Sequence, residues 1–411
     1  MMRTLLITLF AFFSFSLFVK AQNIPQQSQI MLSDSAQISL LTNAPWDEAV
    51  YSLFGHTSIR IKDPARNIDS VFNFGIFNIS KKNFILLFIK GETDYIVAAI
   101  PYQYYLEDQK EKGTGVVEQV FNLTQKEKQD IFDALMVNIL PENREYRYNY
   151  FYDNCATRPR NIIEKYIEGK INYTPTDKDQ TFRDLVRESV HVRSWMEFGI
   201  DLVIGADADK TITDREKDFL PIYLMNAYQG ATIQGDSIQR SLLVSTNEIL
   251  EPAPFKQDFP VTPLQVGIIL LIITLLISYL SYQKDLITLG KIFDTILFFI
   301  AGTAGCIIFF LMFFSIHPCT NPNWNIIWLN PLQLIVSLLF FVKSFSKCIY
   351  YYHFINFVAL LALLLAWSLI PQQLELAFIP FILSIAIRSG INILQYRKIN
   401  RKAVYSLPRT R

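Results

Sequence analysis

The chain has 411 residues, of which 51% are hydrophobic and 18% charged, and its formal net charge at pH 7 is +1. This length leaves room for two domains, and the balanced charge gives no basic footprint for nucleic acid, so no nucleic-acid partner is expected. The mean hydropathy of +0.23 is high for a soluble protein, and the excess lies at the extreme N-terminus and beyond Pro263.

Residues 1–21 have the pattern of a signal peptide. A basic residue, Arg3, precedes an apolar run from Leu5 to Val19, and Ala21 offers a small residue at a cleavage site. No cysteine stands near that site, which excludes a lipoprotein signal. An uncleaved anchor helix is the alternative, and either interpretation makes the segment that follows an exported one.

Residues 22–259 alternate between strand and helix patterns, which predicts an exported α+β domain with a small, mostly antiparallel sheet. Strands are expected over 37–42, 57–62, 70–74, 94–100 and 115–121. Helices are expected over 103–110, 126–140, 154–168, 182–190 and 214–228. Prolines at 260 and 263 predict a stiff linker over 260–263.

Five apolar segments follow, at 264–280, 292–316, 326–342, 354–370 and 376–394, each near the roughly 20 residues that cross a bilayer. They predict an all-α five-helix transmembrane domain over 264–394 and a basic cytoplasmic tail over 395–411. Lysines and arginines flank one side of these segments, whereas the loops at 317–325 and 371–375 have none, which is the positive-inside pattern. The protein should therefore be a multi-pass inner-membrane protein with a periplasmic N-terminal domain and a cytoplasmic C-terminus.

Ionisable residues are rare within the apolar segments. Asp294 and Arg388 fall towards segment ends, where long side chains can reach the interface. A transporter would be expected to carry buried charge, so the bundle is predicted to be a lipid-facing platform.

Cys155 is the only cysteine among the first 305 residues. It follows Asp153 and Asn154, both good N-cap residues, and it lies at the start of the helix expected over 154–168. The free N–H groups and the dipole at a helix start favour a thiolate. The pattern indicates a catalytic thiol.

Three polar residues around this cysteine are candidates for substrate binding. Arg158 and Arg160 could bind a phosphate head group by charge-assisted hydrogen bonds, or could be ordinary charges on a solvated helix face. Asn154 is the third candidate, because it lies next to the thiol.

His56 stands just before the strand expected over 57–62. It could be a buried structural histidine, but its pairing with a lone cysteine favours a general base that takes the thiol proton and later returns it. A third group should orient the imidazole, and Asn73 on the next strand is our candidate. The other histidines, His191, His317 and His353, show no metal-ligand spacing, so neither a metal nor a cofactor is expected.

The loop at 317–325 is polar, rich in asparagine and on the same side of the membrane as Cys155. His317, Asn323 and Trp324 are therefore further candidates for substrate binding, although an ordinary turn with an interfacial tryptophan would look the same. The loop also holds Cys319, and a structural disulfide between Cys155 and Cys319 is the alternative to a catalytic thiol in an oxidising compartment.

Several motifs agree in order with one known family. They are FGHTSIR at 54–60, VFNFG at 71–75, DNCATR at 153–158, FGIDL at 198–202, FLP at 219–221 and HPCTNPNWN at 317–325. The order of histidine before cysteine resembles the circularly permuted papain-like, NlpC-related acyltransferases and amidases. The whole set resembles the Lnb lipoprotein N-acyltransferases of Bacteroidota over nearly the whole chain after the signal peptide.

The resemblance implies a permuted papain-like exported domain, and N-acylation of the diacylglyceryl-modified N-terminal cysteine of lipoproteins. The partners it implies are a phospholipid acyl donor and a diacylated lipoprotein acceptor, which meet at the inner membrane. Cys155 would carry the acyl chain as a thioester. Two alternatives stay open: a membrane-anchored thiol hydrolase acting on peptidoglycan peptides or phospholipid esters, and a non-enzymatic scaffold held by the Cys155–Cys319 disulfide.

Overall fold

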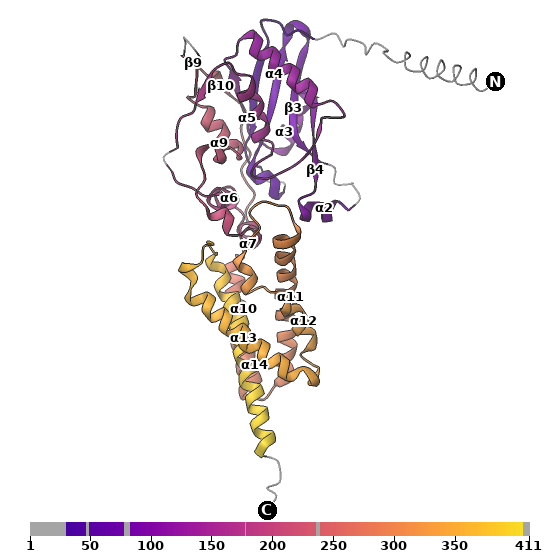
Figure 1. Ribbon diagram of the computed structural model, residues 1–411, viewed down its shortest axis with the longest axis vertical. Helices are drawn as coiled ribbons and strands as arrows, with labels where there is room; N and C mark the ends of the chain where they lie inside the picture. The colour runs from indigo at the N-terminus through magenta and orange to yellow at the C-terminus, as the bar shows by residue number, and fades with distance from the viewer. Residues whose placement is uncertain (1–29, 47–48, 78–82, 177, 236–238, 406–411) are drawn as a thin grey trace, which may run out of the picture.

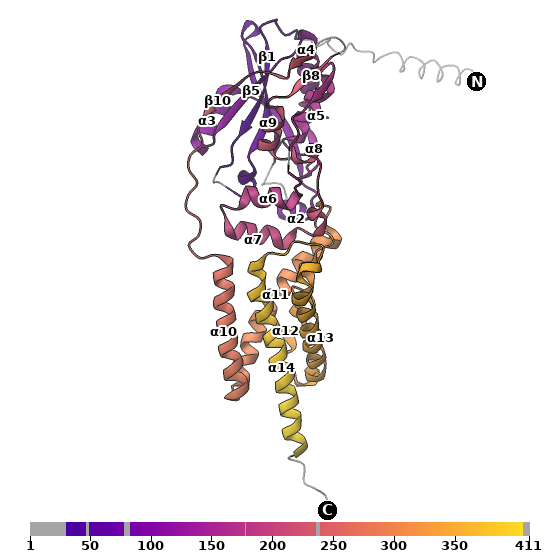
Figure 2. The ribbon, with the colours of Figure 1, turned by 90° about the vertical axis from the view of Figure 1, so that its left-hand side faces the viewer.

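The computed structural model describes residues 30–46, 49–77, 83–176, 178–235 and 239–405. The predicted signal peptide and the last six residues of the predicted tail lie outside this set. A mixed N-terminal domain stands above a helical C-terminal domain, and α14 (Ile379–Tyr405) leads away from the N-terminal domain to the C-terminal end (Figure 1). Helices α6 (Phe182–Val190) and α7 (Ser194–Val203) lie between the sheet and the helical domain (Figure 2).

The main sheet of the described residues has seven strands, all paired antiparallel, in the order β10-β5-β1-β2-β3-β4-β6. They are β1 (Gln37–Asn43), β2 (His56–Asp63), β3 (Ile68–Ile76), β4 (Asp94–Pro101), β5 (Val116–Phe121), β6 (Glu145–Arg147) and β10 (Leu243–Leu250). The five predicted strands are confirmed. A second sheet, β7 (Lys170–Asn172), β8 (Thr232–Gln234) and β9 (Gln239–Ser241), consists of strands too short to show a pattern in the sequence.

Helices cover both faces of the main sheet. Because successive side chains of a strand point to opposite faces, Leu40 joins the core beneath α4 (Gln125–Asn138) and α5 (Thr157–Tyr166), whereas Leu41 packs beneath α3 (Tyr102–Lys112). The first of these cores is the larger one, and α5 within it positions Cys155.

Three helical features of the N-terminal domain differ from the prediction. The helix expected over 214–228 is divided into α8 (Asp214–Lys217) and α9 (Pro221–Tyr228), because Pro221 lacks an N–H group and begins a new helix instead. Helices α2 (Phe84–Lys90) and α7 (Ser194–Val203) were not predicted. Helix α6 (Phe182–Val190) has the predicted bounds.

In the described residues, four helices of the C-terminal domain are long and apolar enough to cross a membrane. They are α10 (Pro263–Gln283), α11 (Ile287–Phe314), α13 (Ser346–Leu365) and α14 (Ile379–Tyr405). The third predicted segment is also helical and apolar, but its helix is shorter than the other four. That segment forms a 3-10 turn, η4 (Trp324–Ile327), and the short helix α12 (Leu332–Leu339), divided at Pro331.

The third segment packs closely against α11. A Cβ atom on Gly302 would stand 2.1 Å from the backbone N of Leu334, and one on Gly305 would stand 2.5 Å from the carbonyl oxygen of Leu329. Small residues let helices approach closely within a membrane. These two glycines therefore let the irregular segment pack against a long helix.

The prediction that the side chains of Asp294 and Arg388 extend to the membrane–water interface is wrong. Both are buried within the bundle, with exposed fractions of 2% and 0%. Arg388 Nε donates to Asp294 Oδ1 at 2.5 Å and Nη2 to Oδ2 at 2.9 Å, while Nη1 donates to Ser278 and Ser281 of α10. A charge held away from water needs such partners, and the bundle is therefore tied together by an internal ion pair.

Candidate active site

His56 and Asn73 project from the same face of neighbouring strands. Ser58 of β2 lies opposite Asn73 of β3, and His56 precedes Ser58 by two residues, so its side chain points to the face that Asn73 occupies. Nε2 of His56 lies 2.7 Å from Oδ1 of Asn73. This contact leaves Nδ1 as the ring nitrogen available to Cys155, with which the imidazole also forms a hydrogen bond.

Cys155 is held at the start of α5 by the residue before it. The amide oxygen of Asn154 accepts hydrogen bonds from the N–H groups of Ala156 at 2.8 Å and Thr157 at 2.9 Å, and its NH₂ group donates to the carbonyl oxygens of Tyr150 and Phe219. Helix α5 begins at Thr157 rather than at residue 154, so Cys155 lies just before the helix, in a turn that the Asn154 side chain holds. All four hydrogen-bonding positions of the amide are taken inside the protein, so we assign Asn154 to holding the thiol rather than to binding substrate.

The surroundings of Cys155 favour an ion pair with His56. Burial alone would raise the pKa of Cys155, but the charge of His56, its hydrogen bond, the N–H of Thr57 and the hydroxyl of Tyr148 outweigh burial, and the pKa is lowered. Burial alone would lower the pKa of His56, but the sulfur charge and the hydrogen bonds with Cys155 and Asn73 raise it. A thiolate beside an imidazolium is the reactive form of such a pair.

Gly75 lets the pair stand close to β3. Its φ of 120° belongs to the region that favours glycine. A Cβ atom on Gly75 would stand 3.3 Å from Cε1 of His56 and 3.8 Å from Cβ of Cys155. The end of strand β3 therefore forms one wall of the site.

Tyr148 is a site residue that the sequence analysis missed. Its hydroxyl group hydrogen-bonds to Cys155, and burial, followed by the sulfur charge, holds its pKa well above the usual value, so the phenol stays protonated and donates. The ring stacks on Tyr95 with centroids 4.2 Å apart. Tyrosines alternate at 146, 148, 150 and 152 just before the cysteine, and that pattern was the signal available in the sequence.

The two arginines near the thiol are engaged within the protein. Arg158 forms a two-pronged ion pair with Asp153, at 2.6 and 2.8 Å, and lies over the ring of Tyr146. Arg160 is buried and donates to the carbonyl oxygen of Arg215 at 2.6 Å. Of the two, Arg158 keeps a partly exposed side chain that could still meet an anionic head group.

Cys155 and Cys319 are both free thiols, which contradicts the structural disulfide. They belong to different parts of the molecule, because Cys155 joins the core under α5 while Cys319 packs with Ile204 and its neighbours. Burial, followed by the charge of Asp207, raises the pKa of Cys319 to about 11. Cys319 therefore has none of the activation that Cys155 has.

The loop at 317–325 docks onto the end of α7. The last carbonyl groups of a helix have no partner within it. Here Asn323 Nδ2 donates to the Leu202 carbonyl at 2.8 Å, Asn325 Nδ2 to that of Asp201 at 3.1 Å, and Gln372 Nε2 to that of Ile204 at 3.1 Å. Two of the predicted substrate-binding residues, Asn323 and its neighbour Trp324, thus lie at the joint between the domains. The backbone N–H of Trp324 donates to Gln372 Oε1 at 2.7 Å.

The backbone of the loop completes this joint. The N–H of Gly205 donates to the carbonyl oxygen of Cys319, and the N–H of Ala206 to that of Pro322, both at 2.7 Å. A Cβ atom on Gly205 would stand 2.3 Å from the Pro322 oxygen. The two backbones can therefore meet only because residue 205 is glycine.

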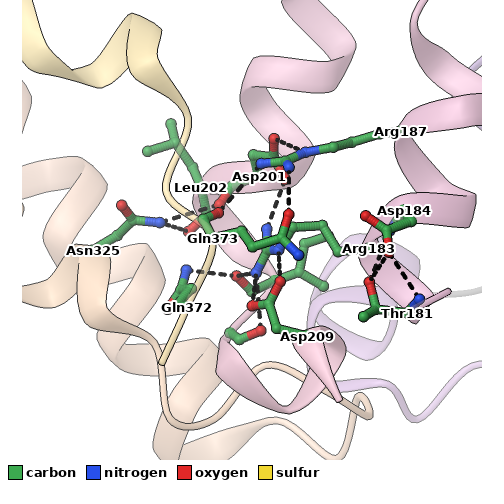
Figure 3. Close-up of polar contacts among 12 residues, drawn as sticks. Thr181, Arg183, Asp184, Arg187, Asp201, Leu202, Asp209, Asn325, Gln372 and Gln373 are labelled. Carbon is green, nitrogen blue, oxygen red and sulfur yellow. Dashed lines mark hydrogen bonds and ion pairs between the residues drawn. The ribbon is translucent and has the colours of Figure 1, made fainter. Parts of the chain in front are cut away.

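A buried charge cluster supports the joint from the side of the N-terminal domain (Figure 3). Arg183 of α6 is fully buried and pairs with Asp201 at 2.6 Å and Asp209 at 2.7 Å. Arg187, one turn further on, reaches Asp201 at 2.9 Å and donates to Gln373 Oε1 at 3.0 Å. The cluster connects α6 and α7 to the outer loop of the helical domain.

His317 lies at a second contact between the domains. Its Nε2 lies 2.6 Å from the carbonyl oxygen of Phe88 in α2, the Ile316 N–H donates to the Lys90 carbonyl at 2.8 Å, and Ser315 Oγ donates to the Ile89 carbonyl at 2.9 Å. His317 is thus not brought to Cys155. It holds α2 against the end of α11.

No set of three His, Cys, Asp or Glu side chains that could hold a metal ion occurs in the described residues.

Comparison with protein-family models gives two matches, which together cover most of the chain. Residues 25–188 match the Lnb N-terminal periplasmic domain, and residues 254–399 match the Lnb transmembrane domain. The chain belongs to the Lnb family. No curated protein and no solved structure gives a match.

The Lnb matches assign the two domains to compartments. The N-terminal domain, with His56, Asn73 and Cys155, is the Lnb periplasmic domain, and the helical domain is the Lnb transmembrane domain. The end of α7 and the turn at Gly205 lie between the two matched stretches. The joint of this Lnb protein is therefore built partly by a segment outside both family models.

Proposed function

We propose that this protein transfers an acyl chain from a phospholipid, through a thioester on Cys155, to the N-terminal amine of diacylglyceryl-cysteine lipoproteins. One observation carries the proposal: Cys155, His56 and Asn73 form a connected thiol–imidazole–amide set in a member of the Lnb family. Family membership suggests the reaction type, and the activated thiol supplies a nucleophile suited to it.

In the first proposed step, the Cys155 sulfur attacks the carbonyl carbon of a phospholipid ester. The carbon–sulfur bond forms and the carbon–oxygen bond of the ester breaks. The leaving oxygen takes the proton of the His56 imidazolium, and lysophospholipid departs. The backbone N–H of Cys155, at the start of α5, is the natural donor to the negative oxygen that develops on the carbonyl.

In the second proposed step, the neutral amine of the lipoprotein attacks the thioester. The amide bond forms, the carbon–sulfur bond breaks, and His56 accepts the proton that the amine loses, which restores the thiolate–imidazolium pair. Asn73 keeps the imidazole ring in the orientation that both steps need, as the third member of such a set does.

Two features of the architecture belong to the same proposal. A cysteine at a helix start, following a histidine on an earlier strand, supports the permuted papain-like fold for the periplasmic domain. The cytoplasmic C-terminus is supported by the distribution of lysine and arginine. The third apolar segment, although short, leads away from the joint between the domains, and α13 leads back towards it. Gln372 and Gln373, which follow α13, make contacts at the joint.

The test is intact-mass analysis of the purified protein in phospholipid, with and without hydroxylamine. We expect an acyl-sized adduct that hydroxylamine removes in the wild type and in Cys319→Ala, and none in Cys155→Ala. A diacylated lipopeptide should then discharge the adduct and become triacylated.

Two results would contradict the proposal. If lysophospholipid accumulates while the lipopeptide is never acylated, the protein is a thiol hydrolase. If the adduct survives in Cys155→Ala, the thiol is not the acyl carrier.

A further inference from the structure

Helix α2 presents apolar side chains to its surroundings on a periplasmic domain. Six of its seven residues are apolar, and none is buried. Ile85 is 73% exposed, and Leu86 and Phe88 are each 49% exposed. Contiguous exposed apolar residues of this kind mark a surface that meets a partner or a membrane.

The position of α2 beside α11 favours a membrane over a protein partner. Its C-terminal carbonyl groups are bonded to Ser315 and Ile316, directly after the end of α11. The outer end of α11 exposes Phe313 and Phe314, at 58% and 61%, and Ile316 just beyond it is 57% exposed. The apolar surface of α2 therefore continues the surface of α11, a helix within the stretch that matches a transmembrane domain, at the end of α11 that faces the N-terminal domain.

A row of aromatic rings leads from α2 to the thiol. Phe84 of α2 stacks on Phe77 with centroids 5.9 Å apart, Phe77 lies 5.1 Å from Tyr95, and Tyr95 stacks on Tyr148 at 4.2 Å. Tyr148 in turn hydrogen-bonds to Cys155. Rings placed in such a series give an apolar path with polar groups only at its end.

We infer that α2 inserts into the outer leaflet and that the aromatic row Phe84–Phe77–Tyr95–Tyr148 receives the acyl chain of a phospholipid on its way to Cys155. The role of α2 at the membrane stands on its exposed surface and its place beside α11. The role of the row rests on the proposed function. Phe77 connects α2 with the thiol site along the chain. It lies directly after β3 and two residues after Gly75, which lines that site.

The insertion of α2 is tested without reference to activity. A photoreactive benzophenone side chain is placed at Leu86 in protein reconstituted in phosphatidylethanolamine and phosphatidylglycerol vesicles, and adducts are identified by mass. The matched control is Val137, which is 53% exposed and belongs to α4, a helix that Figure 1 labels at the end of the N-terminal domain away from the helical domain. We expect lipid adducts at 86 and none at 137, and equal yields at the two positions would overturn the insertion.

The acyl path is tested with two donors for Cys155. One is the phospholipid of the vesicle, and the other is a water-soluble short-chain acyl ester that needs no membrane surface. For the double variant Ile85→Gln, Leu86→Gln, loading from phospholipid should fall by about tenfold, and loading from the soluble ester should stay within about twofold of wild type. Val137→Gln should match the wild type with both donors.

The row itself is tested at Phe77. Phe77→Ser should lower loading from long-chain esters relative to short-chain esters, whereas Phe77→Leu, which keeps the path apolar, should retain the wild-type ratio. An unchanged ratio in Phe77→Ser would overturn the path. If neither donor acylates wild-type Cys155, the proposed function itself has failed, while the photocrosslinking result at 86 still decides whether α2 meets the membrane.

Discussion

Nε2 of His56 lies 2.7 Å from Oδ1 of Asn73, so the amide fixes the ring that faces the thiol. Replacing Asn73 by alanine frees the imidazole to rotate, and we expect the rate of Cys155 acylation to fall by roughly 10- to 100-fold. Asn73→Asp keeps an acceptor oxygen and should retain more activity than alanine. Single-turnover loading measured by mass checks this, and equal rates for Asn73→Ala and the wild type would remove Asn73 from the site.

Alkylation by iodoacetamide should report the ion pair at Cys155. Because the pKa of Cys155 is lowered and that of Cys319 is raised to about 11, only Cys155 of the two should react quickly at pH 7. In His56→Ala the largest favourable contribution is lost, the pKa of Cys155 rises, and its alkylation at pH 7 should slow. Peptide mapping separates the two thiols in one experiment, with Cys319 as the internal control.

The same pair predicts a bell-shaped pH profile for loading from phospholipid. The thiolate is present above the lowered pKa of Cys155, and the imidazolium is present below the raised pKa of His56. Loading should therefore fall as the pH drops through the first value and again as it rises through the second. Alkylation needs only the thiolate and should persist at high pH, so a parallel fall of both reactions would contradict the assignment of His56 as the acid.

Substitution of Gly205 tests the joint between the domains, and substitution of the nearby Gly199 provides a control. Gly205→Ala would place a Cβ atom 2.3 Å from the Pro322 oxygen, whereas Gly199→Ala, within α7, meets nothing within 4 Å. We expect amide hydrogen exchange at the joint to become faster by roughly tenfold or more in Gly205→Ala and to stay at the wild-type rate in Gly199→Ala. Faster exchange in both variants would mean that α7, rather than the joint, is what the substitutions disturb.

The ion pair within the bundle should respond differently to single and double changes. Arg388→Met leaves a buried, unpaired Asp294, and we expect a loss of about 3–5 kcal/mol of stability. The double variant Arg388→Met, Asp294→Leu removes both charges and should recover most of that loss. Thermal unfolding in detergent measures both, with Lys398→Met at the more exposed pair with Asp285 as a control that should cost no more than about 1 kcal/mol.

Local patterns in the sequence predicted five of the seven strands of the main sheet and indicated His56, Asn73 and Cys155, which the structure brings together. Each of these rests on a short-range signal: alternation, or a cap residue before a helix. Helix α2 was missed because seven nearly uniform apolar residues have no period that separates helix from strand.

Features that depend on distant partners could not be predicted. Arg388 and Asp294 are 94 residues apart, so nothing local to either reveals that both point into the bundle. The loop at 317–325 was notable for its asparagines, but their role as partners for the end of α7 appears only when the fold places the two side by side. The third segment is short because Pro331 divides an apolar run into a 3-10 turn and the helix α12.

The end of α7 meets the membrane domain through the side chains of Asn323, Asn325 and Gln372, which are neutral at every physiological pH. Dissolved ions screen attraction between charges but act much less on hydrogen bonds between neutral groups held away from water. The periplasm exchanges small ions with the surrounding medium. These amide contacts, unlike the contact of the charged Arg187 with Gln373, therefore keep their strength when the salinity and acidity of the environment change.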